Sequence, residues 1–228
     1  MVKLYTAVGR FEAKVKFGGK IPTVTVNMKE AELQIEEMIL WSCLMWNIVT
    51  INEARSAFQK KALEYSVAPE RFDAVLERLQ IRHLVVSAEA DRGDEALYKL
   101  LANLYVIPMT SSLFAKVKVF LRLVLRDHMS VSVAKIVFRR ENYTEMEKKV
   151  LDLAKQTHLS CAEILKCIEE SVTDVSTSKK VLDALYDVDY STCDNQGWLV
   201  QFYDNHKNIL EAIATLYLNR NVIFDKYH

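Results

Sequence analysis

The first thirty residues contain short runs in which apolar and polar side chains alternate. Residues 11–17 alternate with a period of two, which is typical of a strand with one buried face. Gly18 and Gly19 are typical of a hairpin turn, because both residues tolerate positive φ. Residues 24–28 alternate on the expected return strand, and residues 4–8 predict a third strand.

The period changes after these strands. Apolar residues then recur every three or four positions, which predicts a helix over residues 29–46. Asn52 is the predicted N-cap of a second helix, and Pro69 is expected in the first turn of a third. Residues 81–86 predict a short strand and residues 97–105 a fourth helix. The predicted core face of the third helix consists of Phe72, Val75, Leu76 and Leu79.

A second alternating region follows and resembles the first. Residues 10–28 and residues 112–138 share an A-K-V-K core, and both continue as a second alternating run. Residues 113–126 therefore predict another strand, although Leu113, Val117 and Leu121 also fit a helical stripe. The repeat favours the strand.

In the last third of the chain, capping residues and apolar spacing again predict helices. Thr144 and Glu147 have the spacing of a capping box, and Ser160 can cap the next helix. Residues 176–186 predict a third helix. Residues 188–192 and 198–203 predict a wing hairpin, followed by a last helix that ends near residue 217.

The order of elements suggests an internal duplication. Apolar positions of the two halves match at separations of 106 to 112 residues, and the separation changes only where loops are expected. The alternative is chance similarity between amphipathic helices. We therefore predict a mainly helical α+β fold with two tandem units, residues 1–108 and 109–228, each of which begins with a β-hairpin.

Composition narrows the class of protein. Half of the 228 residues are apolar and there are few Gly and Pro, so long linkers and turn-rich all-β folds are not expected. The four cysteines form no C-x-x-C pair, which favours reduced thiols and a cytoplasmic protein. No secretory signal or membrane anchor is expected.

Three helices followed by a β element resemble the winged-helix (helix-turn-helix) superfamily. The resemblance covers residues 30–86 and again residues 144–203. Residues 39–58 and 67–86 also resemble the PqqD-type domains, which bind leader peptides and are winged-helix relatives. The resemblance implies either a DNA-binding transcriptional regulator or an adaptor that binds a protein or peptide.

Charge is balanced overall but unevenly distributed. Residues 1–29 carry a net charge of +5 and residues 112–140 a net charge of +6, while the whole chain is neutral. Lys14, Lys16 and Lys20 are expected to lie together on the first hairpin. Such clusters attract phosphates, but charged residues can also simply protect a sheet edge from aggregation.

The predicted recognition helix of the second unit has a polar and basic start, which favours backbone contacts to DNA. The leading hypothesis is a non-enzymatic DNA-binding regulator, and the alternative is a peptide-binding adaptor. The candidate nucleic-acid-binding residues are Lys116, Lys118, Arg122, Arg126, Arg139, Arg140, Thr177, Ser178, Lys179 and Lys180.

No catalytic residues, cofactor, metal or membrane partner is expected, because the sequence contains no phosphate-binding, hydrolase or metalloprotease motif. Trp41, Trp46 and Trp198 are interpreted as core or interface residues. Homodimerisation is left open.

Overall fold

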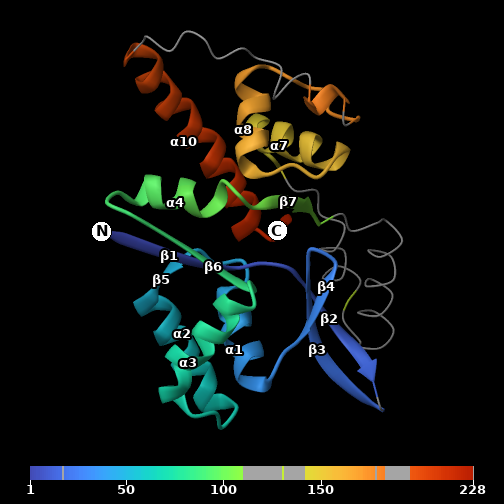
Figure 1. The fold of residues 1–228 in the computed structure, drawn as a ribbon, viewed down its shortest axis with the longest axis vertical. Helices are drawn as coiled ribbons and strands as arrows, with labels where there is room; N and C mark the ends of the chain where they lie inside the picture. The colour runs from blue at the N-terminus through green and yellow to red at the C-terminus, as the bar shows by residue number, and fades with distance from the viewer. Residues whose placement is uncertain (17, 110–129, 131–141, 178, 183–195, 228) are drawn as a thin grey trace.

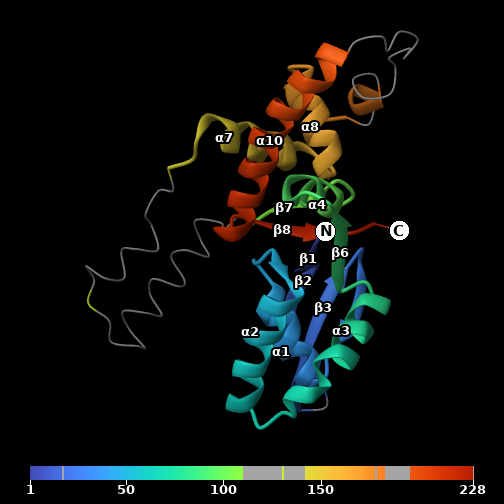
Figure 2. The ribbon, with the colours of Figure 1, turned by 90° about the vertical axis from the view of Figure 1, so that its left-hand side faces the viewer.

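The fold is α+β in the computed structural model, which describes residues 1–16, 18–109, 130, 142–177, 179–182 and 196–227. The helices within residues 35–81 lie at one end of the molecule and those within residues 145–169 at the other, with strands between them, and the sheet of residues 10–32 lies beside the first group (Figure 1). We call residues 2–90 the N-terminal half and residues 105–225 the C-terminal half. Both chain termini lie in the middle layer, near the small sheets (Figure 2).

The N-terminal half begins with strands and continues with helices. The predicted strand near the N-terminus and the hairpin after it are confirmed. Its elements are β1 (Val2–Ala7), β2 (Arg10–Lys16), β3 (Gly19–Val26), β4 (Lys29–Glu32), α1 (Ile35–Leu44), β5 (Val49–Thr50), α2 (Ile51–Glu64), the 3-10 turn η1 (Pro69–Arg71), α3 (Phe72–Ile81) and β6 (Val85–Ala90).

Helix α4 (Gly93–Leu101) connects the two halves and packs on β6 and β1. The described elements of the C-terminal half are β7 (Tyr105–Pro108), α7 (Glu145–Gln156), α8 (Cys161–Glu169), α10 (Gln196–Leu218) and β8 (Val222–Asp225).

The first strand of each half occupies the same place in its sheet. Strand β1 lies between β5 and β6 and is antiparallel to both. Strand β7 pairs with β8, and on its other side it forms an antiparallel bridge to the residue before α8. The matching positions of the two halves are Leu4 and Tyr105, then Thr50 and Ser160, then Ala88 and Asp225.

Four helices begin with the same cap. In each case the backbone N–H of the N-cap residue donates to the carboxylate of a Glu three positions later, which satisfies an otherwise unpaired donor. The predicted caps Thr144 and Ser160 are confirmed, whereas Asn52 is wrong because Thr50 caps α2. The four pairs are Gln34 and Glu37, Thr50 and Glu53, Thr144 and Glu147, and Ser160 and Glu163.

Helices α3 and α10 end in the same turn before their strands. His83 and Arg220 both have positive φ, and a hydrogen bond then closes each turn, from Leu84 N to Leu79 O at 2.9 Å and from Asn221 N to Leu216 O at 2.8 Å. Both α3 and α10 therefore lead into a strand, β6 and β8, through the same kind of turn.

The predicted helix over residues 29–46 is wrong at its start. Residues Lys29–Glu32 form β4, and α1 begins only at Ile35. Asn27 and Met28 both adopt positive φ, so the chain reverses there and β4 pairs with β3. Because tertiary pairing supplies the backbone hydrogen bonds, it overrides the helical spacing of the side chains.

Two further predictions near the junction fail. Tyr105 belongs to strand β7 and not to a helix, because it pairs with Asp225 at the far end of the chain. Residues 198–203 lie within α10 and do not form a wing strand. The predicted strand over residues 113–126 lies outside the described residues.

The hydrophobic core is continuous across both halves. The predicted inward residues of α3 are confirmed as buried. The largest fully buried side chains include Leu40, Phe58, Phe72 and Leu79 from the N-terminal half and Ile164, Tyr217 and Phe224 from the C-terminal half. The two halves are therefore packed together rather than joined by a free linker.

Candidate functional site

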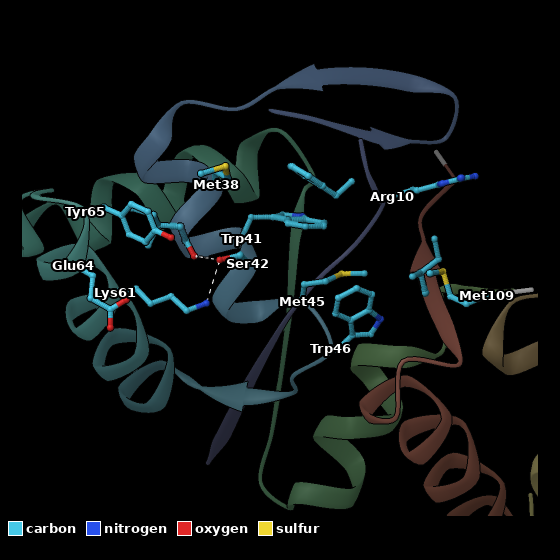
Figure 3. Close-up of a pocket in the computed structure, with 13 residues that line it drawn as sticks. Arg10, Met38, Trp41, Ser42, Met45, Trp46, Lys61, Glu64, Tyr65 and Met109 are labelled. Carbon is cyan, nitrogen blue, oxygen red and sulfur yellow. Dashed lines mark hydrogen bonds between the residues drawn. The ribbon is translucent and has the colours of Figure 1, made fainter. Parts of the chain in front are cut away.

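A groove of about 570 Å³ runs beside α1 (Figure 3). Apolar side chains from α1, β2 and the C-terminal half form most of its surface, and the end of α2 adds three polar ones. Its lining residues are Arg10, Phe11, Met38, Ile39, Trp41, Ser42, Met45, Trp46, Lys61, Glu64, Tyr65, Met109 and Ile223.

Helix α1 is apolar on two faces, and the second face forms the floor of the groove. Leu40 and Leu44 point into the core. Met38, Trp41 and Met45 follow the spacing i, i+3, i+7 and therefore share another face. The Trp41 ring is held in place because its Nε1–H donates to the carbonyl of Val8 at 3.1 Å.

The polar wall belongs to α2. The Lys61 ammonium donates to the Ser42 hydroxyl at 3.4 Å, and this hydroxyl in turn donates to the carbonyl of Ile39 at 2.8 Å (Figure 3). Burial raises the pKa of the neighbouring Cys43 thiol, while the Lys61 charge opposes this shift. The raised pKa favours the protonated, less nucleophilic form of this thiol.

The far end of the groove is supplied by the C-terminal half. Ile223 comes from β8, and Met109 follows β7. The guanidinium of Arg220 lies over the Trp46 ring at 5.2 Å from the ring centroid. The groove is therefore complete only when the two halves are packed together.

Helix α7 begins with the same capping box as α1 but carries charged residues where α1 has two methionines. Counted from the N-caps, Met38 corresponds to Lys148 and Met45 to Lys155. Both lysines are exposed and pair with acidic residues of their own helix. Met38 is half-buried while Trp41 and Met45 are buried, and together they form an apolar groove floor of the kind that small ligands or partner side chains occupy.

One edge of the hairpin sheet beside the groove is open. Sheet order is β2–β3–β4, so β2 is an edge strand, and no described residue pairs with its outer side. Lys16 pairs with Gly19 across a two-residue turn, and hydrogen-bonded pairs alternate from there. The N–H and C=O groups of Phe11, Ala13 and Val15 therefore face outward. Pro22, which lacks an N–H, lies opposite Ala13, as this register requires.

The basic cluster predicted on this hairpin is not present. Lys14 forms an ion pair with Glu30, and Lys16 with Glu32, both across the sheet from β4. Lys20 lies opposite Val15 and therefore on the other face of the sheet. The sequence-based charge count missed this pairing because it stopped before the two glutamates.

The arginines near α3 are also engaged. Arg71 and Arg78 both pair with Glu36 of α1, and Arg82 donates to the buried carboxylate of Glu37 at 2.7 Å. These cations hold α3 against α1. The N-terminal half therefore offers little unpaired positive charge for phosphates along this helix.

Most of the predicted nucleic-acid-binding residues lie outside the described residues, namely Lys116, Lys118, Arg122, Arg126, Arg139, Arg140 and Ser178. Thr177 begins a helical turn, because its carbonyl accepts from Val181 N at 3.1 Å. Lys179 is exposed. Lys180 pairs with Asp174, and together with Ser176 it lowers the pKa of that carboxyl to about 2.

Sequence reasoning missed the groove itself. The available signal was the apolar stripe of α1, which is too wide for a helix with only one buried face. Trp41 is buried, and Trp46 packs at the junction of the halves, as expected for core and interface residues.

Other site types find little support in the described ranges. These ranges contain no group of three or more His, Cys, Asp or Glu placed to hold a metal ion. None of the described helices has the length and apolar character needed to cross a bilayer. In comparisons with known proteins, no family model, no curated protein and no solved structure matches this chain.

Proposed function

We propose that this protein binds an extended peptide or protein segment, which adds as a strand to the free edge of β2 and places apolar side chains in the groove. The observation that carries the proposal is the position of Phe11. Its outward backbone groups belong to the open edge, while its ring lines the groove and packs against Trp41 with centroids 6.1 Å apart.

The register determines which side chains the partner needs. Partner residues that hydrogen-bond to Phe11, Ala13 and Val15 lie directly opposite them and share their face of the sheet. That face of β2 carries the apolar side chains of Phe11, Ala13 and Val15, and the Phe11 ring lines the groove. Intervening partner residues face the side that carries the ion-paired lysines. The expected ligand therefore alternates apolar and polar residues.

The test is a random heptapeptide library panned against the full chain. Enriched peptides should show apolar residues at every second position, and Ala13→Pro should abolish their binding by removing an outward N–H from the edge. Ala13→Val is the matched control, because it keeps the N–H and favours a strand. No enrichment, an i, i+3, i+4 apolar pattern, or unchanged binding to Ala13→Pro would contradict strand addition.

We also propose that the two halves are copies of one winged-helix-like unit. The shared strand register, the shared caps and the shared turn before β6 and β8 support this reading. The division into units 1–108 and 109–228 remains a prediction.

DNA binding by the C-terminal half remains a second proposal. It is supported by the start of the predicted recognition helix, where Thr177 and Lys179 are exposed and Lys180 has only an exposed acidic partner. A mobility shift at low salt tests it: binding should weaken as salt rises and in Lys179→Ala. Absence of binding to any duplex at low salt would remove it.

A further inference from the structure

The two halves meet at the hydroxyl of Tyr217. This residue of α10 is fully buried, and burial raises the pKa of its hydroxyl to about 12. The hydroxyl accepts a hydrogen bond from the backbone N–H of Trp46 at 2.9 Å and donates to the carbonyl of Ala7 at 3.1 Å. Thr6 Oγ1 lies 2.9 Å away. One side chain of the C-terminal half thus holds both β1 and the end of α1.

The same contacts border the groove. Met45 and Trp46 line it, and the Met45 sulfur lies 4.0 Å from the Tyr217 hydroxyl. The Tyr217 ring stacks on Phe224 of β8 at 4.3 Å, next to the groove residue Ile223. The backbone N–H of Gly9 donates to the Phe224 carbonyl at 2.7 Å, which fixes β8 beside the start of β2.

We infer that ligand binding in the groove and packing of the two halves are coupled, and that Tyr217 is the positioning residue of this coupling. The inference rests on the proposed function, since it assumes that the groove is a binding site. The N-terminal half supplies the floor and the C-terminal half the end wall. A ligand that contacts both the floor and the end wall stabilises the packed arrangement of the two halves. By linkage, a change that loosens this packing lowers the affinity for the ligand.

This coupling has a consequence for the whole chain. A peptide bound to the N-terminal half would favour one arrangement of the C-terminal half, which contains the predicted recognition helix. Ligand binding in the groove would then regulate the C-terminal half, in addition to holding the partner.

The experiment uses indole as the probe, because its ring imitates an apolar side chain and its size suits the groove. The full chain is labelled with ¹³C at the methionine methyl groups and titrated by NMR. Three of the seven methionines, Met38, Met45 and Met109, line the groove, while Met28 and Met146 do not. In the unmodified chain, indole should shift the first three methyl signals and leave the other two unchanged.

Tyr217→Phe removes only the hydroxyl and should raise the dissociation constant for indole at least threefold, with a change in the Met45 and Met109 signals before indole is added. Tyr105→Phe is the matched control, because the Tyr105 hydroxyl forms no hydrogen bond with the described residues. It should leave the dissociation constant and the two methionine signals unchanged. Arg220→Asn is a second test at an exposed residue, because Asn also tolerates positive φ but loses the contact with the Trp46 ring. It should also raise the dissociation constant for indole.

The outcomes separate the two ideas. Indole binding that is equally strong in Tyr217→Phe and in Arg220→Asn overturns the coupling and leaves the groove as a binding site. Absence of any groove-specific methyl shift in the unmodified chain overturns the groove itself, and the coupling with it. Weakened binding in both variants, with Tyr105→Phe unchanged, supports the inference.

Discussion

The carboxylate of Asp225 accepts a hydrogen bond from the backbone N–H of Asn27 at 2.9 Å, although the two residues are 198 positions apart in the chain. Asn27 begins the turn between β3 and β4, where two consecutive residues have positive φ. Asp225 ends β8 and is nearly buried. The last strand of the C-terminal half therefore holds the turn of the first hairpin sheet.

Removing this carboxylate should destabilise the protein. Asp225→Ala leaves the Asn27 N–H without its partner, and we expect the free energy of unfolding to fall by about 1–3 kcal/mol. Asp225→Asn keeps a side-chain acceptor and should cost less. Urea unfolding measures both values, and equal stability of the alanine variant and the unmodified chain would show that the contact contributes nothing.

Gly9 has no room for a side chain, unlike Gly18, Gly19 and Gly93. Its φ is +94°, and a Cβ atom would lie 2.5 Å from the Val26 Cγ2 and 2.7 Å from the Thr25 carbonyl. Backbone strain and overlap act together, so Gly9→Ala should lower the free energy of unfolding by at least about 2 kcal/mol. Gly18→Ala is the matched comparison, because its φ is also positive but no atom lies near its Cβ position. Thermal unfolding of both variants separates overlap from backbone strain.

The pKa of Asp174 should respond to Lys180. The Lys180 hydrogen bond is the largest cause that lowers this pKa from 3.8 to about 2, and Ser176 adds to it. The folded state therefore gains stability above pH 3.8 and loses it as pH falls through 2. Lys180→Met should raise the pKa toward 3.8, as measured by carboxyl NMR titration, whereas Lys179→Met should not. An unchanged pKa in Lys180→Met would refute the assignment.

Local features of the chain were predictable because neighbours in sequence create them. A capping box needs only two side chains three positions apart, so Thr144 and Ser160 were identified correctly. The hairpin of β2 and β3 was predicted for the same reason, since alternation and a glycine turn are both local. The core face of α3 follows from helical spacing alone.

The secondary-structure predictions were wrong where the backbone pairs with a strand that is distant in the sequence. Residues 29–32 have helical spacing, but pairing with β3 and two cross-strand ion pairs make them a strand. Tyr105 continues the apolar pattern of α4, yet its partner is Asp225, 120 positions later. Periodicity reports which faces are apolar and carries no information about which remote segment will cover them.

The amino-acid sequence by itself determined the α+β class, the starts of α7 and α8 and the apolar face of α3, because these depend on side chains within one or two turns of each other. Only the tertiary structure decided that Lys14 and Lys16 of the hairpin form ion pairs with β4, and that Tyr217 joins the halves beside a groove. Burial and ion pairing depend on residues that are distant in the chain but adjacent in space. Their free energies therefore cannot be predicted from local sequence patterns.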